Sequence, residues 1–251
     1  MIISLRRMAA VATVLLGTLN LMFCPFNAAK ADPIPLIINN LGGTDPDKFY
    51  QGLSGIVPAT LKTTGRFSWN VSTGEVFNPV DELIATVGGG SIDAQMLRVQ
   101  GVINKWAVLR VLEHDTGHMT MQMRLEPDDV TYRLGARIVL LADGIQHPYF
   151  TLFNLASDGA VNFVYPVTDG KRRDSLTIAP GVPFRLPLQV TPPFGADHFI
   201  AIASANPLSR LHAELKAIDG KPLPANMSEL LESHLTGETY QLGMQGVFSG
   251  R

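Results

Sequence analysis

The feature that most constrains this fold is a series of short apolar segments in the middle of the chain. Beyond residue 129, stretches rich in Val, Ile, Leu, Phe and Tyr are separated by Asp-Gly, Pro-Gly and Pro-Pro dipeptides. Turn residues at this spacing are typical of the strands of a β-sandwich or barrel. The predicted strands are residues 132–142, 149–155, 161–167, 175–178, 184–190 and 199–203.

A long helix is predicted before these strands. Apolar residues recur every three or four positions from Met96 to Leu112, which is the spacing of one helical face. We expect this helix to end near His114. After it, Met119, Met121 and Met123 alternate with polar residues, which indicates a half-buried strand.

Two further helices and a last strand are predicted near the C-terminus. Asn206, followed by Pro207, resembles a helix start. Asn226 with Glu229 resembles a capping box, in which the two side chains satisfy backbone N–H groups at the start of a helix. Residues 240–244 then alternate as a strand does.

Together these patterns predict an α+β protein, mainly β, with an immunoglobulin-like β-sandwich and flanking helices near the C-terminus. We divide the chain into a signal peptide (1–31), an irregular N-terminal extension with a short strand region (32–100), and a β-rich domain with C-terminal helices (101–251). The extension is predicted to be irregular because Gly, Pro, Asn and Asp are frequent in its first half.

The first residues resemble a secretory signal peptide. Arg6 and Arg7 precede an apolar run over residues 8–23, and Ala29 and Ala31 provide small residues before an expected cut after Ala31. A retained membrane anchor is the alternative, since the run approaches the length that spans a bilayer. We expect an exported protein of the bacterial periplasm or cell surface, without stable membrane insertion if the signal is cleaved.

Charge and cysteine content exclude several functions. The 20 Lys and Arg residues nearly balance the 22 Asp and Glu residues, so the sequence has no electrostatic signature of nucleic-acid binding. Cys24 is the single cysteine and lies in the segment expected to be removed. A mature chain starting at Asp32 would therefore have neither a disulfide nor a cysteine nucleophile.

The most chemical-looking stretch is EHDTGH, residues 113–118. His114 and His118 are spaced as zinc ligands on a helix would be, and together with Asp115 they suggest a metal-dependent hydrolase as an alternative function. Asp115, Thr116 and Gly117 disfavour that helix, however, and a single Asp-Thr-Gly is a weak aspartic protease signal. A turn between helix and strand is the favoured interpretation, and no metal or other cofactor is expected.

Four segments carry a resemblance to a known family: KWAVLRVLE (105–113), YRLGARIVL (132–140), PYFTLFNLASDGAVNFVYPV (148–167) and LPLQVTPPFGADHFIAIAS (186–204). They resemble the accessory domain of unknown function that lies C-terminal to the peptidase domain in bacterial caspase-like proteins. The resemblance implies a small β-rich, non-catalytic module. The chain lacks the Gln-Ala-Cys-x-Gly signature of the peptidase, so no catalytic residue is carried over.

We therefore expect an exported, non-enzymatic binding or scaffolding module whose protein partner is unidentified; a purely structural envelope component is a further alternative. The sequence does not predict its oligomeric state. The candidate partner surface is the segment between strands that contains Pro192, Pro193, Phe194, Asp197 and His198. The alternative there is structural, with the two prolines setting a crossover and Phe194 buried.

Overall fold

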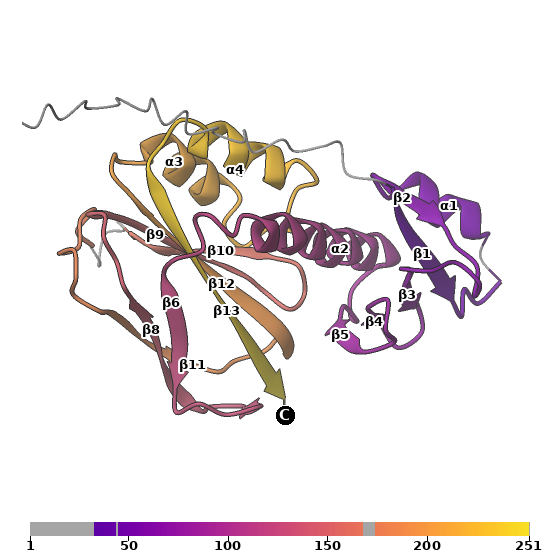
Figure 1. The fold of residues 1–251 in the computed structure, drawn as a ribbon. Helices are drawn as coiled ribbons and strands as arrows, with labels where there is room; N and C mark the ends of the chain where they lie inside the picture. The colour runs from indigo at the N-terminus through magenta and orange to yellow at the C-terminus, as the bar shows by residue number, and fades with distance from the viewer. Residues whose placement is uncertain (1–32, 44, 168–173, 251) are drawn as a thin grey trace, which may run out of the picture.

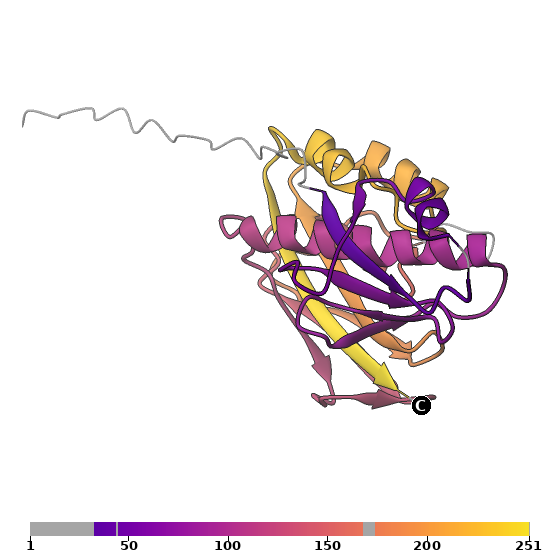
Figure 2. The same ribbon diagram turned by 90° about the vertical axis from the view of Figure 1, so that its right-hand side faces the viewer.

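The structure, a computed structural model, describes residues 33–43, 45–167 and 174–250. Strands dominate these residues and form three sheets, so the predicted α+β, mainly β class is confirmed. The N-terminal sheet lies at one end of the long helix α2, and the other two sheets lie beside its other end (Figure 1). Figure 2, with the N-terminal part toward the viewer, shows α2 running across the molecule.

The N-terminal part is more regular than its composition suggested. Its five-stranded sheet has the order β2-β1-β3-β4-β5, with β1 parallel to both of its neighbours. Helix α1 covers it and buries Phe49 against Trp69 with ring centroids 5.7 Å apart. The elements are β1 (Ile34–Asn39), α1 (Pro46–Gln51), β2 (Ile56–Pro58), β3 (Phe67–Asn70), β4 (Glu75–Phe77) and β5 (Leu83–Thr86). The predicted irregular lead-in was therefore wrong, because short strands here pair with segments distant in sequence.

Helix α2 (Ile92–His114) connects two hydrophobic cores. Its first turn is capped by Ser91, whose side chain accepts a hydrogen bond from Ala94 N. Val99, Val102 and Ile103 pack into the N-terminal core, whereas Val108, Leu109 and Leu112 pack into the core of the C-terminal region. The predicted helix over these residues is confirmed, and it crosses the boundary that we had drawn at residue 100.

The C-terminal region contains two sheets with a shared apolar layer. The five-stranded sheet has the order β10-β9-β12-β13-β7, and the three-stranded sheet has the order β11-β8-β6. Leu140 and Leu186 from the smaller sheet meet Phe150 and Ala201 from the larger one. The strands are β6 (Gln122–Glu126), β7 (Tyr132–Arg133), β8 (Arg137–Asp143), β9 (Tyr149–Leu155), β10 (Val161–Tyr165), β11 (Phe184–Gln189), β12 (Gly195–Ser204) and β13 (Tyr240–Gly250).

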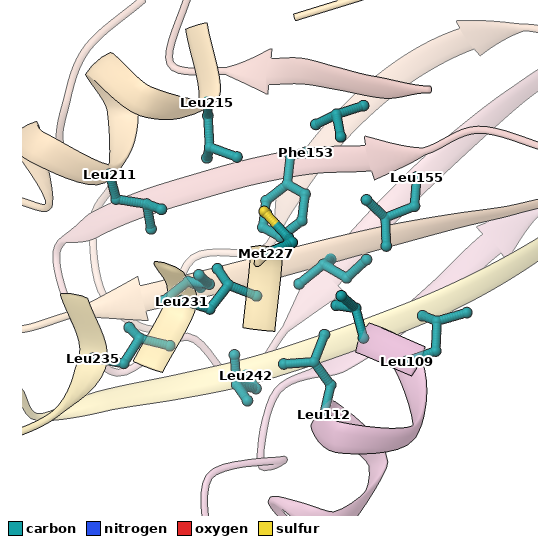
Figure 3. Packing of buried hydrophobic residues seen from close by; sticks show 14 of the residues in the cluster. Leu109, Leu112, Phe153, Leu155, Leu211, Leu215, Met227, Leu231, Leu235 and Leu242 are labelled. Carbon is teal, nitrogen blue, oxygen red and sulfur yellow. The ribbon is translucent and has the colours of Figure 1, made fainter. Parts of the chain in front are cut away.

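Helices cover the other face of the C-terminal five-stranded sheet, β10-β9-β12-β13-β7. Leucines of α2, α3 (Ser209–Ala217) and α4 (Met227–Leu235) pack there on Phe153 and Leu242 (Figure 3). The C-terminal region thus has three layers: helices, a five-stranded sheet and a three-stranded sheet. Burial of apolar side chains on both faces of the central sheet is the main favourable contribution to folding that this arrangement provides.

The predicted starts of α3 and α4 need correction. The cap position of α3 is Leu208 rather than Asn206, and the Asn206 side chain donates to Glu238 at 3.0 Å. Asn226 does occupy the cap position of α4, but its side chain makes no capping hydrogen bond. Its backbone is close to helical (φ −89°, ψ 16°) rather than extended as a side-chain cap requires, so the predicted capping box does not form.

The predicted strands agree with the structure to different degrees. Residues 149–155 form a strand with the predicted bounds, whereas residues 132–142 are divided into β7 and β8. Residues 175–178 do not form a strand and contribute one isolated bridge, between Thr177 and Tyr149. An alternating sequence is not sufficient for a strand, because no neighbouring segment pairs with residues 175–178 along their whole length.

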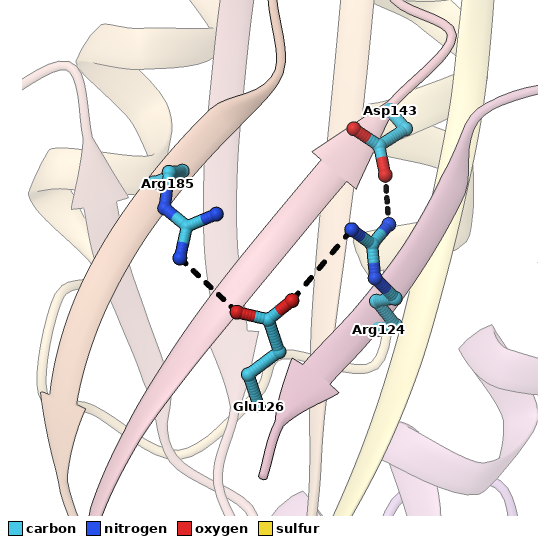
Figure 4. A network of polar contacts seen from close by, with 4 residues as sticks. All are labelled: Arg124, Glu126, Asp143 and Arg185. Atoms are coloured by element: carbon cyan, nitrogen blue, oxygen red, sulfur yellow. Dashed lines mark hydrogen bonds and ion pairs between the residues drawn. The ribbon is translucent and has the colours of Figure 1, made fainter. Parts of the chain in front are cut away.

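The outer face of the three-stranded sheet carries a polar network (Figure 4). Glu126 accepts from Arg185 at 3.1 Å and lies 3.8 Å from Arg124, which also pairs with Asp143. Arg124 and Arg185 both lie directly opposite Leu141, which is 1% exposed. Since exposed ion pairs contribute little stability, the aliphatic stems that cover Leu141 are the more important part of this network.

Two glycines bring α2 into direct contact with the β9–β10 turn. A Cβ added at Gly101 would lie 2.6 Å from Gly159 O, and one added at Gly159 would lie 2.2 Å from Val102 N. Gly159 also has a φ of 82°, which L side chains rarely adopt. Only glycine at both positions permits this approach of helix and turn.

Replacing Gly101 by Ala should therefore lower the free energy of unfolding by about 2 kcal/mol or more, because backbone atoms of the turn must move. Urea denaturation monitored by circular dichroism measures the change. Gly117→Ala is the control, since its added Cβ meets nothing within 4 Å. Equal stability of the two variants would contradict the proposed contact.

Candidate functional site: a cavity between the two sheets

A cavity of about 410 Å³ lies between the two sheets of the C-terminal region. Its lining comes from β8, β9, β10, β11, β12 and β13 and from the segment that follows β11. Ile138, Val164, Phe199 and Val247 are among its apolar lining. Its polar lining comprises Asn154, Asn162, Gln189, Thr191, Asp197 and Ser249. This size and mixed lining are typical of small-ligand or side-chain binding sites.

The cavity follows from the way the edges of the two C-terminal sheets meet. β10 and β11 are end strands of their sheets, and they do not pair with each other. On the other side, β6 approaches β13, where Met121 N donates to Leu242 O at 3.0 Å. The two sheets therefore separate on the side of β10 and β11, which both line the cavity.

Asp197 is the titratable residue that lines this cavity. Its Oδ1 accepts a hydrogen bond from Ser157 N at 2.8 Å. Burial raises the pKa of this carboxyl to about 6, against the opposing effects of the Lys105 charge and the Ser157 hydrogen bond, while Asp158 adds to the rise. Its charge therefore changes in mildly acidic solution, around a pH of about 6.

Lys105 lies behind this carboxyl and is completely buried. It extends from α2, and its Nζ donates to Ala156 O at 3.1 Å and to Ala196 O. Burial lowers the pKa of Lys105 to about 8, although Asp197 and Asp158 both favour its charged form. One cation therefore faces two carboxylates, and the ionised group has a net charge of −1.

Asn154 contributes a second acceptor to the cavity. Its Oδ1 is buried, and no donor in the described part of the chain bonds to it. Asn154 pairs with Phe199 across β9 and β12, so Asp197 is its diagonal neighbour on the same face of the sheet. A buried acceptor without a donor is costly to the folded protein.

The structure brings three of the five predicted partner residues to the cavity. Pro192 and Pro193 are exposed at its rim, with a cis peptide between them, and Asp197 lies inside. Phe194 is half-buried and packs against the core between the sheets, as the structural alternative anticipated. Asp197 and His198 belong to strand β12 rather than to the predicted loop, since both pair along β13.

His198 points to the opposite face of the sheet from Asp197, as neighbours along a strand do. Its ring meets Trp106 of α2 edge to face, with centroids 5.6 Å apart. Burial, and then the charge of Lys105, lowers the pKa of His198 to about 3, so this ring is neutral at physiological pH. It helps to support the helix and does not line the 410 Å³ cavity.

The EHDTGH stretch forms the predicted turn. Asp115 accepts from Tyr240 Oη at 2.8 Å and lies 2.7 Å from His118 Nδ1, while the His118 and Tyr240 rings stack at 4.0 Å. His114 Nδ1 lies 2.6 Å from Arg110 O of its own helix. The described residues contain no group of three or more His, Cys, Asp or Glu side chains that could hold a metal ion.

Comparison with known proteins leaves the family open. No protein-family model matches the chain, and no curated protein matches it significantly. In the described ranges, no helix is both long and apolar enough to cross a membrane. The predicted signal peptide and Cys24 lie outside the described residues.

Lys105 and Asn154 were missed by the sequence analysis. A signal for Lys105 was present, because it is the one charged residue between Arg98 and Arg110 in the helix. No comparable signal marked Asn154, whose environment depends on the packing of two sheets.

Replacing Lys105 by Met should change how stability depends on pH. The unfolded state binds more protons than the folded state between the folded pKa of about 8 and the ordinary value of 10.5, so Lys105 makes stability rise with pH in that window. The full rise corresponds to about 3 kcal/mol and should be absent in Lys105→Met. Chemical denaturation at several pH values measures it.

The exposed Lys216→Met is the matched control and should keep the rise. The Asp197 carboxyl should also titrate above its value of about 6 in Lys105→Met, because the neighbouring cation is lost. Carbon NMR of the carboxyl follows this. An unchanged Asp197 titration would show that Lys105 does not act on this carboxyl.

Tyr240→Phe tests the EHDTGH turn. It removes the hydrogen bond to Asp115 but leaves an aromatic ring beside His118. We expect the free energy of unfolding to fall by about 1.5–3 kcal/mol, as for a hydrogen bond to a charged group. Thermal and urea unfolding check it, and a variant as stable as the wild type would mean that this bond contributes nothing.

Proposed function

We propose that this chain is an exported, non-catalytic binding module that receives part of a protein partner in the 410 Å³ cavity. The observation that carries the proposal is the position of this cavity, which lies between two sheets and beside the exposed Pro192–Pro193 rim. A rigid proline pair beside a partly apolar hollow offers contact area at a low cost in conformational entropy.

The lining supports binding rather than catalysis. Among the described residues that line the cavity, Asp197 is the single titratable one, and its hydrogen bond to Ser157 N holds it in place. General acid–base catalysis commonly uses a second positioned group facing the same substrate. The remaining polar lining consists of amides and hydroxyls, which recognise ligands through hydrogen bonds.

The resemblance of four segments to the accessory domain of bacterial caspase-like proteins adds a candidate partner. A caspase-like peptidase or another envelope protein fits an exported module of this kind. We further propose that the two C-terminal sheets form an immunoglobulin-like sandwich, which is supported by their facing apolar layers. Nothing in the described contacts favours the metal-dependent alternative through His114, Asp115 and His118, and we do not carry it further.

Site-specific photo-crosslinking tests the proposal. A photoreactive amino acid is placed at Thr191 on the rim, or at the exposed Lys216 on α3 as the control, and the chain is expressed in its native cells. We expect a discrete protein adduct from position 191 and none from position 216, because the partner reaches the cavity past this rim.

A cavity-filling variant makes the test specific. Asn162→Trp places a large side chain in the cavity and should lower the yield of the Thr191 adduct about tenfold, which corresponds to roughly 1.4 kcal/mol of binding. Arg210→Trp, at an exposed position of α3, should leave the yield unchanged. An adduct that forms equally well in Asn162→Trp, with the fold confirmed by circular dichroism, would reject the cavity as the binding site.

A further inference from the structure

The groups that face the cavity favour a positively charged ligand. No Lys, Arg or His is present among the described lining residues, while Asp197 contributes a carboxylate. Lys105 neutralises only part of the local charge, because Asp158 and Asp197 both interact with it electrostatically. A bound cation would bring the net charge of these groups from −1 to zero.

The positions of the acceptors favour a flat cation with several N–H groups. Asn154 and Asn162 lie directly opposite each other on β9 and β10, and Asp197 lies diagonally across from Asn154 on β12. Diagonal neighbours of this kind are about 7–8 Å apart, which is within reach of donors on different edges of one planar group. Asn154 also lines the cavity, and its Oδ1 has no hydrogen-bond donor among the described residues.

An aromatic ring completes the arrangement. Phe199 lies two residues from Asp197 on the same face of β12 and also lines the cavity. The face of an aromatic ring attracts a cation, and guanidinium stacks on it better than ammonium does. A guanidinium group pairs with carboxylates and stacks on aromatic faces, and its remaining N–H groups can donate to an amide oxygen.

We propose that the cavity binds a guanidinium group, with Asp197 as its ion-pair partner, Asn154 as a second acceptor and Phe199 as the stacking surface. This inference rests on the proposed function, in which the source of the group is an arginine side chain of a protein partner. A free small guanidine offers the same chemistry and is distinguished by the choice of probe.

The test is a titration of the full chain with three probes, in which the chemical shifts of the backbone amides are monitored by NMR. The probes are N-acetyl-arginine amide, its neutral isostere N-acetyl-citrulline amide, and methylguanidine. We expect the arginine probe to shift the Ser157 amide, which bonds to Asp197, and to bind about tenfold more tightly than the citrulline probe. Tighter binding of the arginine probe than of methylguanidine indicates a peptide source, and equal binding indicates a free guanidine.

Two variants locate the interaction. Asp197→Asn keeps the size of the side chain and should weaken binding of the arginine probe about tenfold or more. Asp128→Asn is the matched control, because Asp128 lines a separate hollow of about 220 Å³ and should leave the affinity unchanged. Equal binding to wild type and Asp197→Asn, or equal binding of the citrulline probe, would overturn the proposal.

The pH dependence tests it without any substitution. Asp197, with a pKa of about 6, is ionised at about pH 7.5 and protonated at about pH 5, so affinity should fall as the pH is lowered. The charged or titratable neighbours are Lys105 from α2, Asp158 from the β9–β10 turn and His198 from β12. Lys105 is mostly charged over this window and gains charge as the pH falls, which also disfavours a cation, while His198 stays neutral, so neither reverses the sign. An affinity that is constant over this window would reject Asp197 as the partner.

The outcomes separate this inference from the proposed function. Protein adducts at Thr191 without binding of any guanidinium probe would refute the ligand class and leave the binding module intact. Binding of methylguanidine without any protein adduct would refute the protein partner and leave the guanidinium site intact.

Discussion

The position of helix α2 on the C-terminal sheet depends on hydrogen bonds made by the buried ammonium group of Lys105. Its Nζ reaches from α2 to Ala156 O, beside the end of β9, and to Ala196 O, at the start of β12. The first half of the same helix packs against the N-terminal sheet. A charge removed from water needs such partners, because an uncompensated buried charge costs several kcal/mol. Lys105 therefore specifies where the helix meets the sheet.

The charge of Lys105 also affects the pKa of Asp197, which lines the cavity on the other face of the sheet. Lys105 opposes the effect of burial on Asp197 and so keeps the pKa of this carboxyl at about 6 rather than higher. The carboxyl is consequently ionised at neutral pH although it is largely desolvated. A desolvated, hydrogen-bonded carboxylate interacts more strongly with an incoming cation than an exposed one does, because water screens it less.

Local patterns predicted the parts of the fold that depend on local periodicity. The strand at residues 149–155 and the helix that ends at His114 were found in this way. β1 was missed because it is stabilised by parallel pairing with β3, about thirty residues away along the chain. The burial of Lys105 depends on carbonyls 51 and 91 residues away. The sequence therefore singled out Pro192, Pro193 and Asp197, which line the cavity, but not the cation behind them.

The side on which β10 and β11 do not pair limits how a partner could bind to the two sheets. An exposed edge strand usually invites another strand to pair with it. The edge of β10 is already occupied, because Val161 N donates to Lys221 O, Gly220 N donates to Val161 O, and Phe163 N donates to Asp219 Oδ1. A partner that approaches β10 therefore finds few free backbone groups and instead meets the side chains of the cavity. Any recognition at this surface would depend on side-chain chemistry, and among the described residues that line the cavity Asp197 is the single titratable one.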